Sequence, residues 1–250
     1  MSRIAVLRPA LRGFAEQWVL NMPASRRLRF FHALNALEQY AQGRVITVLD
    51  AGCGEGLFTE MVARRHRRWT IVGADLDEAQ LEKGRRRVEE AKLGNVHFEH
   101  LDLTRDLGRS EYDAVVAIEC LMEIEDDESA LHSMARALRS GGLFFAHVPK
   151  RDWAPVLSRS EATWRHEVRH GYTVDDLTSM LSRAGLTETS VRPSSRAIVQ
   201  VAQEIRDRIK TRGLKLQLAA LPLSMAAVRL ERWGLSWGDA RAIFVEARRR

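Results

Sequence analysis

Short apolar segments alternate with amphipathic segments through the middle of the chain, between residues 44 and 148. The apolar segments are rich in β-branched residues and predict strands, while apolar positions that recur every three or four residues predict helices. Strands that alternate with helices predict βαβ units and a mostly parallel sheet with helices on both faces. The expected strands are 44–50, 69–75, 96–101, 112–118 and 143–148, and the expected helices are 57–66, 77–94 and 127–142.

The pattern changes on both sides of this region. Beyond residue 149, Thr173 and Asp176 form the capping-box signature of a helix over 173–186. Two more helices are expected between the last two strands, 187–193 and 240–250, which bring the sheet to seven strands. Residues 9–42 are also expected to be helical, because apolar side chains recur there at helical spacing: Leu28, Phe31, Leu34 and Leu37.

These elements suggest how the chain is organised. We expect an N-terminal helical cap over residues 1–43 and an α/β domain over 44–250, with a helical insertion at about 197–235 before the last strand. A chain of 250 residues, of which 45% are hydrophobic and 29% charged, is long enough to bury such a core.

Composition adds expectations about the surroundings of the protein. The chain has no run of 18 apolar residues and its first residues lack a long apolar stretch, so we expect a cytoplasmic protein without a transmembrane helix. Cys53 and Cys120 lie far apart and predict neither a disulfide framework nor a metal-binding cysteine pair. The net charge is +6, with arginines gathered at 64–68, 84–87 and 248–250. These clusters fit solvated helix faces, or a footprint for nucleic acid or lipid head groups.

A glycine-rich turn follows the first expected strand directly. It reads DAGCGEG from Asp50 to Gly56, which gives a G-x-G-x-G spacing between a strand and a helix. A dinucleotide-binding turn would read G-x-G-x-x-G, but Leu57 takes the place of its third glycine. The carboxylate of Asp50 would repel a pyrophosphate and can pair with an ammonium group. The turn therefore argues against NAD and favours a ligand that carries an amino acid moiety.

This turn resembles motif I of the class I S-adenosylmethionine-dependent methyltransferases, and other elements follow in the order of that family. Asp75 ends the second strand, 19 residues after Gly56, and Asp102 follows the third strand. The segment YDAVVAIECLMEI is similar to the family's fourth-strand motif, and LRSGGLFFAHVP is similar to its turn into the fifth strand. The resemblance implies a Rossmann-like fold and S-adenosylmethionine as the cofactor.

The resemblance also implies roles for single residues. Asp75 would accept the ribose hydroxyls, Asp102 and the backbone of Leu103 would meet the adenine, and Glu119 to Leu121 would lie beside the sulfonium. The full set of implied cofactor-binding residues is Asp50, Gly52, Cys53, Gly54, Asp75, Leu76, Asp102, Leu103, Glu119 and Cys120.

Residues 166–170 spell H-E-x-x-H, the letters of a zinc-protease helix. Such a site needs two histidines on one helix face, a glutamate base and a third ligand. Gly171 and the Thr173 cap leave little helix beyond His170, and the extended motif would need a glycine at 173 and a histidine at 176. We therefore expect no zinc and no other metal.

The same stretch leaves the carboxyl end of the fifth strand, where the family commonly lines its acceptor pocket. On this interpretation Trp164 and Tyr172 contact the acceptor, and His166 and His170 are candidate general bases for a hydroxyl. The alternative is a surface helix whose histidines and arginines are solvated.

The acceptor itself is less well defined by the sequence. Glu119 and Cys120 stand where base-methylating enzymes carry proline-containing signatures, which argues against nucleic acid. The apolar segment 216–228, interrupted by Pro222, could be a core helix, a lid or a peripheral membrane contact. We expect a small or medium, partly hydrophobic metabolite and O-methylation by in-line transfer. C- or N-methylation of a lipid, quinone-like or nucleic-acid acceptor remains an alternative, as does a non-catalytic S-adenosylmethionine-binding scaffold.

Overall fold

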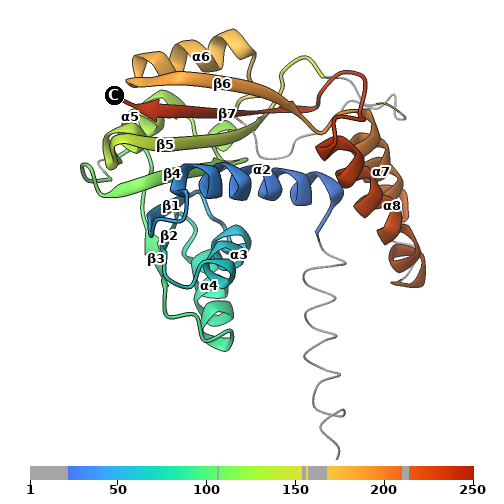
Figure 1. The fold of residues 1–250 in the computed structure, drawn as a ribbon, viewed down its shortest axis with the longest axis horizontal. Coiled ribbons are helices and arrows are strands. Elements are labelled where there is room, and N and C mark those ends of the chain that lie inside the picture. Colours follow the sequence, from blue (N-terminus) through green and yellow to red (C-terminus); the bar gives the residue numbers. More distant parts are fainter. Residues whose placement is uncertain (1–21, 106, 154–155, 157–167, 210–213) are drawn as a thin grey trace, which may run out of the picture. The chain divides into compact units, whose positions relative to one another are not determined.

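The computed structural model describes residues 22–105, 107–153, 156, 168–209 and 214–250. Its central element is a seven-stranded sheet in the order β3-β2-β1-β4-β5-β7-β6, which Figure 1 shows from β3 at one edge to β6 at the other. The strands are β1 (Thr47–Ala51), β2 (Thr70–Asp75), β3 (Val96–His100), β4 (Tyr112–Ile118), β5 (Leu138–Pro149), β6 (Leu186–Ser194) and β7 (Ala242–Arg249). The helices are α2 (Ala24–Ala41), α3 (Leu57–Arg65), α4 (Glu78–Glu90), α5 (Asp127–Ala137), α6 (Val174–Arg183), α7 (Ala197–Ile209) and α8 (Leu214–Arg232), with the short 3₁₀ helix η2 (Leu121–Glu123).

The strands β1 to β5 are parallel, whereas β7 runs antiparallel to β5. Leu143 lies opposite Arg248 and Pro149 lies opposite Ala242 in that pair. The seven predicted strands and the mostly parallel sheet with helices on both faces are thus confirmed.

The chain divides into two compact units. One comprises Phe30–Asp152, Thr163–Pro193 and Ala242–Arg250 and holds the sheet, while the other comprises Met1–Arg29, Trp153–Ala162 and Ser194–Arg241 and holds α7 and α8. The predicted domain boundary at residue 43 stays a prediction.

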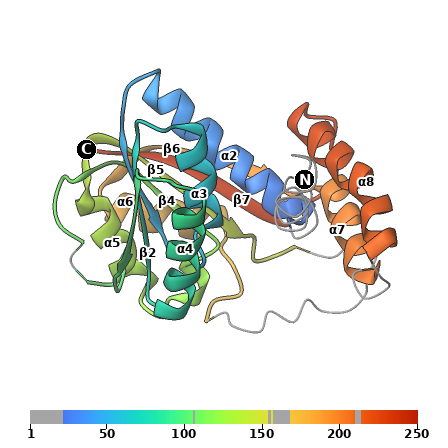
Figure 2. The same ribbon diagram turned by 90° about the horizontal axis from the view of Figure 1, so that it is seen from below.

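In the first unit, successive strand residues point to opposite faces of the sheet. Val115 and Phe144 join Leu131 of α5 and Leu177 of α6 in one buried cluster. On the other face, the ring of Phe145 stacks on that of Phe244, and His32 of α2 stacks on Phe244 as well. Figure 2 shows α5 and α6 on one face of the sheet and α3 and α4 on the other. Both faces are therefore covered, and the loops at the strand ends remain available for binding.

Two local expectations were wrong. The helix predicted over 127–142 ends at Ala137, because Leu138 turns extended, with φ −68° and ψ 147°, and begins β5. Gly141 and Gly142 lie within β5, where its pairing with β4 changes register, and do not end a helix. A Cβ on Gly142 would lie 2.8 Å from the carbonyl oxygen of Arg139.

The buried face of α2 also differs in part from the expected one. Leu28 and Leu37 are fully buried, as predicted. Phe31 and Leu34 are only half-buried, whereas Phe30 is buried against Phe58 of α3 with ring centroids 5.2 Å apart.

The second unit has a small core of its own. Val199 and Ala202 of α7 pack with Ala227 and Val228 of α8, and with Ala24 and Leu28. Pro222 lies inside α8, which continues through it. Among the helices that the structure describes, none is long and apolar enough to cross a membrane.

Candidate functional site

A cavity of about 640 Å³ lies at the carboxyl ends of the parallel strands. In open α/β sheets this edge is where ligands bind, because the loops after neighbouring strands meet there. Each of the first four strands contributes two of the predicted residues to the wall: Gly52 and Gly54 after β1, Asp75 and Leu76 at the end of β2, Asp102 and Leu103 after β3, and Glu119 and Cys120 after β4. Segments far apart in the sequence therefore converge on one cavity, and their role in cofactor binding stays a prediction.

The turn after β1 needs glycine for two different reasons. Gly52 has φ +69°, and a Cβ there would lie 2.3 Å from Cβ of Cys120, so no side chain fits. Gly56 is equally crowded, since a Cβ would lie 2.5 Å from the ring of Phe98. Gly54 has φ +53° but faces open space. A backbone without side chains thus forms one wall of the cavity, and a ligand can approach it closely.

The Asp75 carboxylate ties this turn to the next loop. Its Oδ2 accepts a hydrogen bond from the Gly54 amide at 2.7 Å, and its Oδ1 accepts one from the Asp77 amide at 2.9 Å. The amides of Gly52 and Cys53 donate to the carbonyl of Ala74, at 2.8 and 3.0 Å. Asp75 is therefore both a wall of the cavity and the residue that fixes the geometry of the glycine turn.

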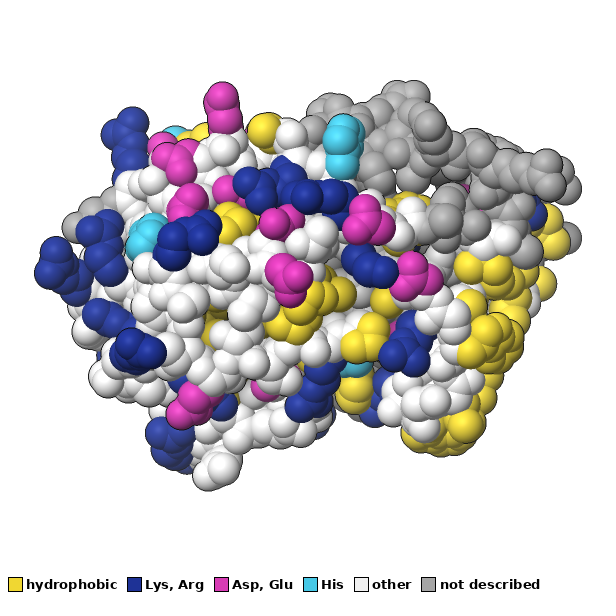
Figure 3. All heavy atoms as spheres, turned by 90° about the horizontal axis from the view of Figure 1, so that it is seen from above, with side chains coloured by type: hydrophobic (Ala, Val, Ile, Leu, Met, Phe, Trp, Pro, Cys, Tyr) yellow, Lys and Arg dark blue, Asp and Glu magenta, His cyan; other side chains and the backbone are white. Residues whose placement is uncertain are grey.

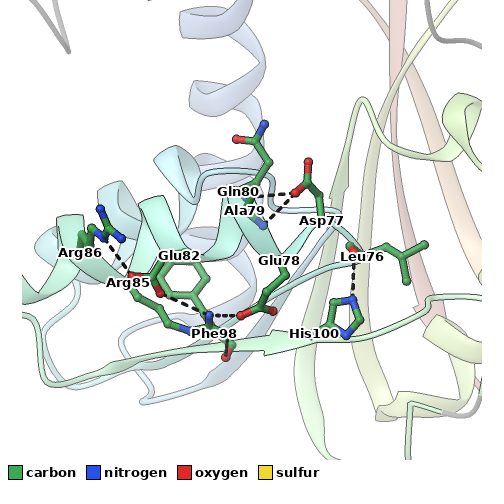
Figure 4. A network of polar contacts seen from close by, with 10 residues as sticks. All are labelled: Leu76, Asp77, Glu78, Ala79, Gln80, Glu82, Arg85, Arg86, Phe98 and His100. Carbon is green, nitrogen blue, oxygen red and sulfur yellow. Dashed lines mark hydrogen bonds and ion pairs between the residues drawn. The ribbon is translucent and has the colours of Figure 1, made fainter.

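The loop after β2 is held at both of its ends. The Asp77 carboxylate accepts from the amides of Ala79 and Gln80 and so caps α4, while the His100 ring lies 2.9 Å from the carbonyl oxygen of Leu76 (Figure 4). The side chain of Leu76 is 63% exposed and lines the cavity. The loop consequently presents one apolar side chain beside the Asp75 carboxylate.

Asp50 and Cys53, predicted to bind the cofactor, do not line the cavity. Asp50 is 3% exposed, and its Oδ2 accepts a hydrogen bond of 2.5 Å from the Thr59 hydroxyl. Burial raises the pKa of this carboxyl from 3.8 to about 7. Burial also raises the pKa of the Cys53 and Cys120 thiols, so both are protonated near neutral pH and are poor nucleophiles.

Carboxylates dominate the wall of this cavity, which we call the acid-lined cavity. Among its described lining residues there is no lysine or arginine, and the acidic ones are Asp75, Asp102, Glu119, Glu123, Glu125 and Asp126. Hydrogen bonds from Thr104 hold the pKa of Asp102 below its ordinary value, which keeps it charged. Such a field attracts cationic groups and repels phosphates. The acids 123–126 were not predicted, although the run EIEDD after the fourth strand carries the signal.

A buried histidine supports one of these carboxylates. Nδ1 of His147 in β5 lies 2.8 Å from Oε1 of Glu119, and the Glu119 amide donates to the His147 carbonyl at 2.9 Å. Glu119 adopts φ +57°, in the left-handed region. Sequence reasoning missed His147, for which the signal is one histidine inside the apolar strand LFFAHV.

The predicted acceptor residues have different outcomes. Trp164 and His166 lie outside the described residues. His170 is exposed, and the two residues before it, Val168 and Arg169, donate their amides to the carbonyl of Met122 in η2, at 3.0 and 3.2 Å. The segment is thus attached beside Glu123, which lines the acid-lined cavity.

Tyr172, another predicted acceptor residue, is buried in the structure, and its role in acceptor binding stays a prediction. It is fully buried in the cluster under α5 and α6, and its hydroxyl donates to Oδ2 of Asp127 at 2.7 Å. It is not among the residues that line the acid-lined cavity. Its backbone forms a parallel bridge with Lys150, which follows β5.

Within the described ranges, no group of three or more histidine, cysteine, aspartate or glutamate side chains could hold a metal ion. His166 and Glu167 of the H-E-x-x-H stretch are outside those ranges. The expectation that the chain binds no metal stays a prediction.

Several known proteins with similar sequences are methyltransferases. Residues 48–142 match the family model described as methyltransferase domain. The chain is 28% identical to a probable S-adenosylmethionine-dependent methyltransferase of Mycolicibacterium smegmatis over 70% of each protein. It is also 28% identical to the ubiquinone biosynthesis O-methyltransferase of Acinetobacter baylyi, over 46% of this chain and 49% of that protein. The chain thus spans only about half the length of this second relative.

Among solved structures, the fold is shared with the N-methyltransferase NodS from Bradyrhizobium japonicum in complex with S-adenosylhomocysteine. The TM-score is 0.58 at 15% identity, over 93% of this chain and 91% of that one. The domain match, the relatives and the strand order agree with the glycine turn and the acid-lined cavity. The domain model, the relatives and the shared fold together support a class I S-adenosylmethionine-dependent methyltransferase, an enzyme whose cofactor is S-adenosylmethionine.

Proposed function

We propose that the protein transfers the methyl group of S-adenosylmethionine to a hydroxyl oxygen of a small or medium, partly hydrophobic metabolite. The observation that carries the cofactor part is the acid-lined cavity at the carboxyl ends of β1 to β4, with the bare Gly52–Gly54 backbone as one wall. S-adenosylmethionine carries a sulfonium and an ammonium group, and both suit a wall of carboxylates.

The lining residues suggest where each part of the cofactor would bind. The Asp75 oxygens would accept the ribose hydroxyls, and Asp102 with the Leu103 backbone would meet the adenine. Glu119 and Cys120 would lie beside the sulfonium. Asp50 lies beneath the turn, so its proposed attraction for the ammonium group would act through the glycine backbone above it.

The reaction would be an in-line displacement. A lone pair of the acceptor oxygen attacks the methyl carbon, the carbon–sulfur bond breaks, and its electron pair stays on sulfur, which becomes a neutral thioether. The hydroxyl proton passes to a base, for which His166 and His170 are the candidates. Because positive charge disappears from sulfur, alignment and exclusion of water would supply most of the acceleration.

The relatives and one exposed surface support a partly hydrophobic acceptor. The relative from Acinetobacter baylyi is an O-methyltransferase of ubiquinone biosynthesis. In this chain, Trp233 and Trp237 are 72% and 68% exposed, and Figure 3 shows apolar side chains gathered on one face. The other large apolar side chains exposed in α8 and the turn after it are Leu216, Leu223, Met225 and Leu235. Tryptophan is typical of membrane–water interfaces, so this surface also supports peripheral contact with lipid.

Cofactor binding can be tested at Asp75 by calorimetry with S-adenosylhomocysteine. Asp75→Asn should weaken binding by about 1–3 kcal/mol, because a charge-assisted pair of hydrogen bonds is lost. Asp77→Asn is the matched control, since it removes the same charge nearby while asparagine still caps α4. Equal affinity in both variants would remove Asp75 from the ribose site, and tighter binding of NAD would overturn the proposed function.

Methyl transfer and its base can be tested with S-adenosylmethionine that carries a ¹³C-methyl group, offered with a panel of phenolic amphiphiles. The chemical shift of the product methyl separates O-, N- and C-methylation. His166→Gln or His170→Gln should slow O-methylation by roughly 10²–10⁴-fold and less at high pH, while cofactor affinity is kept. His132→Gln, an exposed histidine on α5, is the control. Wild-type rates in both single variants and the double variant would exclude a histidine base, and cofactor binding without any turnover would favour the scaffold alternative.

A further inference from the structure

A second cavity, of about 410 Å³, lies at the end of the sheet where the parallel strands β1 and β2 begin. Gly43 and Arg44, which precede β1, line one side, and the turn 65–69 between α3 and β2 lines the other. It therefore sits at the amino ends of the parallel strands, whereas the acid-lined cavity sits beyond their carboxyl ends. Its walls belong entirely to the unit that holds the sheet.

The charge of this second cavity is the reverse of the first, and we call it the basic cavity. Glu38 is the only acidic residue among its described lining residues. The cationic or titratable lining residues are Arg44, Arg65, His66, Arg67 and Arg68. The lining residues thus bring four guanidinium groups and one carboxylate.

Part of this positive charge is already used within the protein. Oε1 of Glu38 accepts from Arg65 at 2.6 Å and lies 2.9 Å from Nε2 of His66. Arg44 donates to the carbonyls of Tyr40 and Ala41, at 2.8 and 3.1 Å, and so closes the end of α2. These contacts explain why Arg44 and Arg65 are present without any ligand.

Arg67 and Arg68 have no such explanation. Neither guanidinium forms a hydrogen bond or ion pair with any residue of the described part of the chain. Both residues follow the last helical residue of α3, Arg65, in an exposed turn, so they are not last-turn cations of the kind that favour a helix dipole.

Contacts of Trp69 and Asn95 hold the turn that carries these two arginines. Trp69 is 5% exposed, its ring stacks on His66 with centroids 3.8 Å apart, and its Nε1 donates to the Arg44 carbonyl at 3.0 Å. Nδ2 of Asn95 donates to the carbonyls of His66 and Trp69 at 3.1 and 3.0 Å. The backbone on both sides of Arg67 and Arg68 is thus held in place before any ligand binds, which reduces the entropic cost of binding.

We propose that the basic cavity binds a phosphate monoester through Arg67 and Arg68. Guanidinium groups match phosphate oxygens with paired hydrogen bonds, and the rigid turn places two of them side by side in the chain. A cavity of about 410 Å³ suits a compact anion rather than a nucleic-acid duplex. The group can belong to a phosphorylated metabolite or to a lipid head group that ends in a phosphate monoester.

The test measures, by calorimetry, the affinity of the full chain for inorganic pyrophosphate. Arg67→Gln/Arg68→Gln should weaken pyrophosphate binding at least about tenfold, because charge-assisted hydrogen bonds are lost. Arg109→Gln/Arg192→Gln is the matched control, since these two arginines are also exposed, lie outside the cavity wall and form no ion pair with described residues. S-adenosylhomocysteine should bind both double variants as it binds the wild type, because its cavity lies at the other edge of the sheet.

Vesicles identify the source of the phosphate. Flotation with phosphatidic acid vesicles, but not with phosphatidylcholine vesicles, and its competition by pyrophosphate would assign a lipid head group; pyrophosphate binding without flotation would assign a free phosphate monoester. Equal losses in the two double variants would show a general effect of net charge and would overturn the proposal. Absence of pyrophosphate and vesicle binding in the wild type would do the same, whatever the cofactor affinity.

Discussion

Nδ1 of His147 lies 2.8 Å from Oε1 of Glu119, and the histidine side chain that makes this contact is almost completely buried. The same histidine accepts the Glu119 amide through its carbonyl. Two contacts from one strand residue therefore hold Glu119 in its left-handed conformation and keep its carboxylate at the wall of the acid-lined cavity.

This arrangement predicts a difference between two ligands of nearly the same shape. Glu119→Gln should weaken binding of S-adenosylmethionine by roughly tenfold, because the carboxylate that we propose to lie beside the sulfonium is lost. S-adenosylhomocysteine, whose sulfur is neutral, should lose much less. Calorimetry with both ligands measures the ratio, and Glu89→Gln, a change on the exposed surface of α4, should leave both affinities unchanged. Equal losses for the two ligands would place Glu119 away from the sulfur.

Asp50 predicts a dependence of stability on pH. Burial raises the pKa of Asp50 from its ordinary value of 3.8, which we take for the unfolded chain, to about 7 in the folded protein. The folded state therefore holds the proton more tightly than the unfolded chain does. The contribution of Asp50 to the free energy of unfolding therefore falls as the pH rises from about 4 to about 7 and is constant above that range.

Asp50→Asn removes this ionisation while Thr59 can still donate to the amide oxygen. Without ligand, the variant should be more stable than the wild type at pH 8, by at most about 4 kcal/mol. The difference should shrink towards pH 4. Urea unfolding across this range measures it, and a difference that is the same at every pH would show that the carboxyl is not titrating in the folded state.

Gly52 and Cys120 predict a pair of compensating substitutions. Gly52→Ala combines φ +69° with a Cβ placed 2.3 Å from Cβ of Cys120, whereas Gly54→Ala has a similar φ and open space. Gly52→Ala should therefore cost roughly 1–3 kcal/mol more stability than Gly54→Ala, the scale of an overpacked site. Cys120→Gly should recover part of that difference in a double-mutant cycle measured by chemical denaturation. Full additivity of the two changes would mean that the turn relaxes away from Cys120.

Tyr172 separates a structural role from acceptor binding. Tyr172→Phe leaves the buried Asp127 carboxylate without its hydroxyl donor, so the free energy of unfolding should fall by about 1–3 kcal/mol. Cofactor affinity should not change. Tyr40→Phe, at a half-buried tyrosine of α2, is the control and should be close to neutral. Unchanged stability together with a higher KM for the acceptor would instead return Tyr172 to the acceptor site.

The central strands were predictable because they are nearly continuous apolar runs that are buried on both faces, as for residues 112–118 of β4. The helix before β5 was predicted too long because LRSGG has the glycines of a helix end, whereas its backbone irregularity depends on pairing with β4. The sequence pattern of α2 also could not predict which of two adjacent apolar residues, Phe30 and Phe31, is buried. Only packing against α3 selects Phe30.

For the site, the sequence was most informative where chain order dictates position. The residues that follow β1 to β4 converge because the carboxyl ends of parallel strands share one edge. The burial of a side chain could not be predicted in the same way. Asp50 is buried under its own turn and Tyr172 under α5, and neither burial follows from spacing along the chain. The acids at 123–126 resemble an ordinary solvated run until the fold places them around a cavity.

The helices α7 and α8 begin and end at one point of the chain's path, where the Arg241 amide donates to the Ser195 carbonyl at 3.2 Å. The two residues that flank this segment of about 45 residues are thus joined by one hydrogen bond, as in a β-hairpin whose turn has been replaced by two helices. Evolution can lengthen, exchange or delete such a module without altering the register of β7 on β5. Residues 196–240 are therefore the natural unit to exchange between relatives, with Ser195 and Arg241 kept at its two ends.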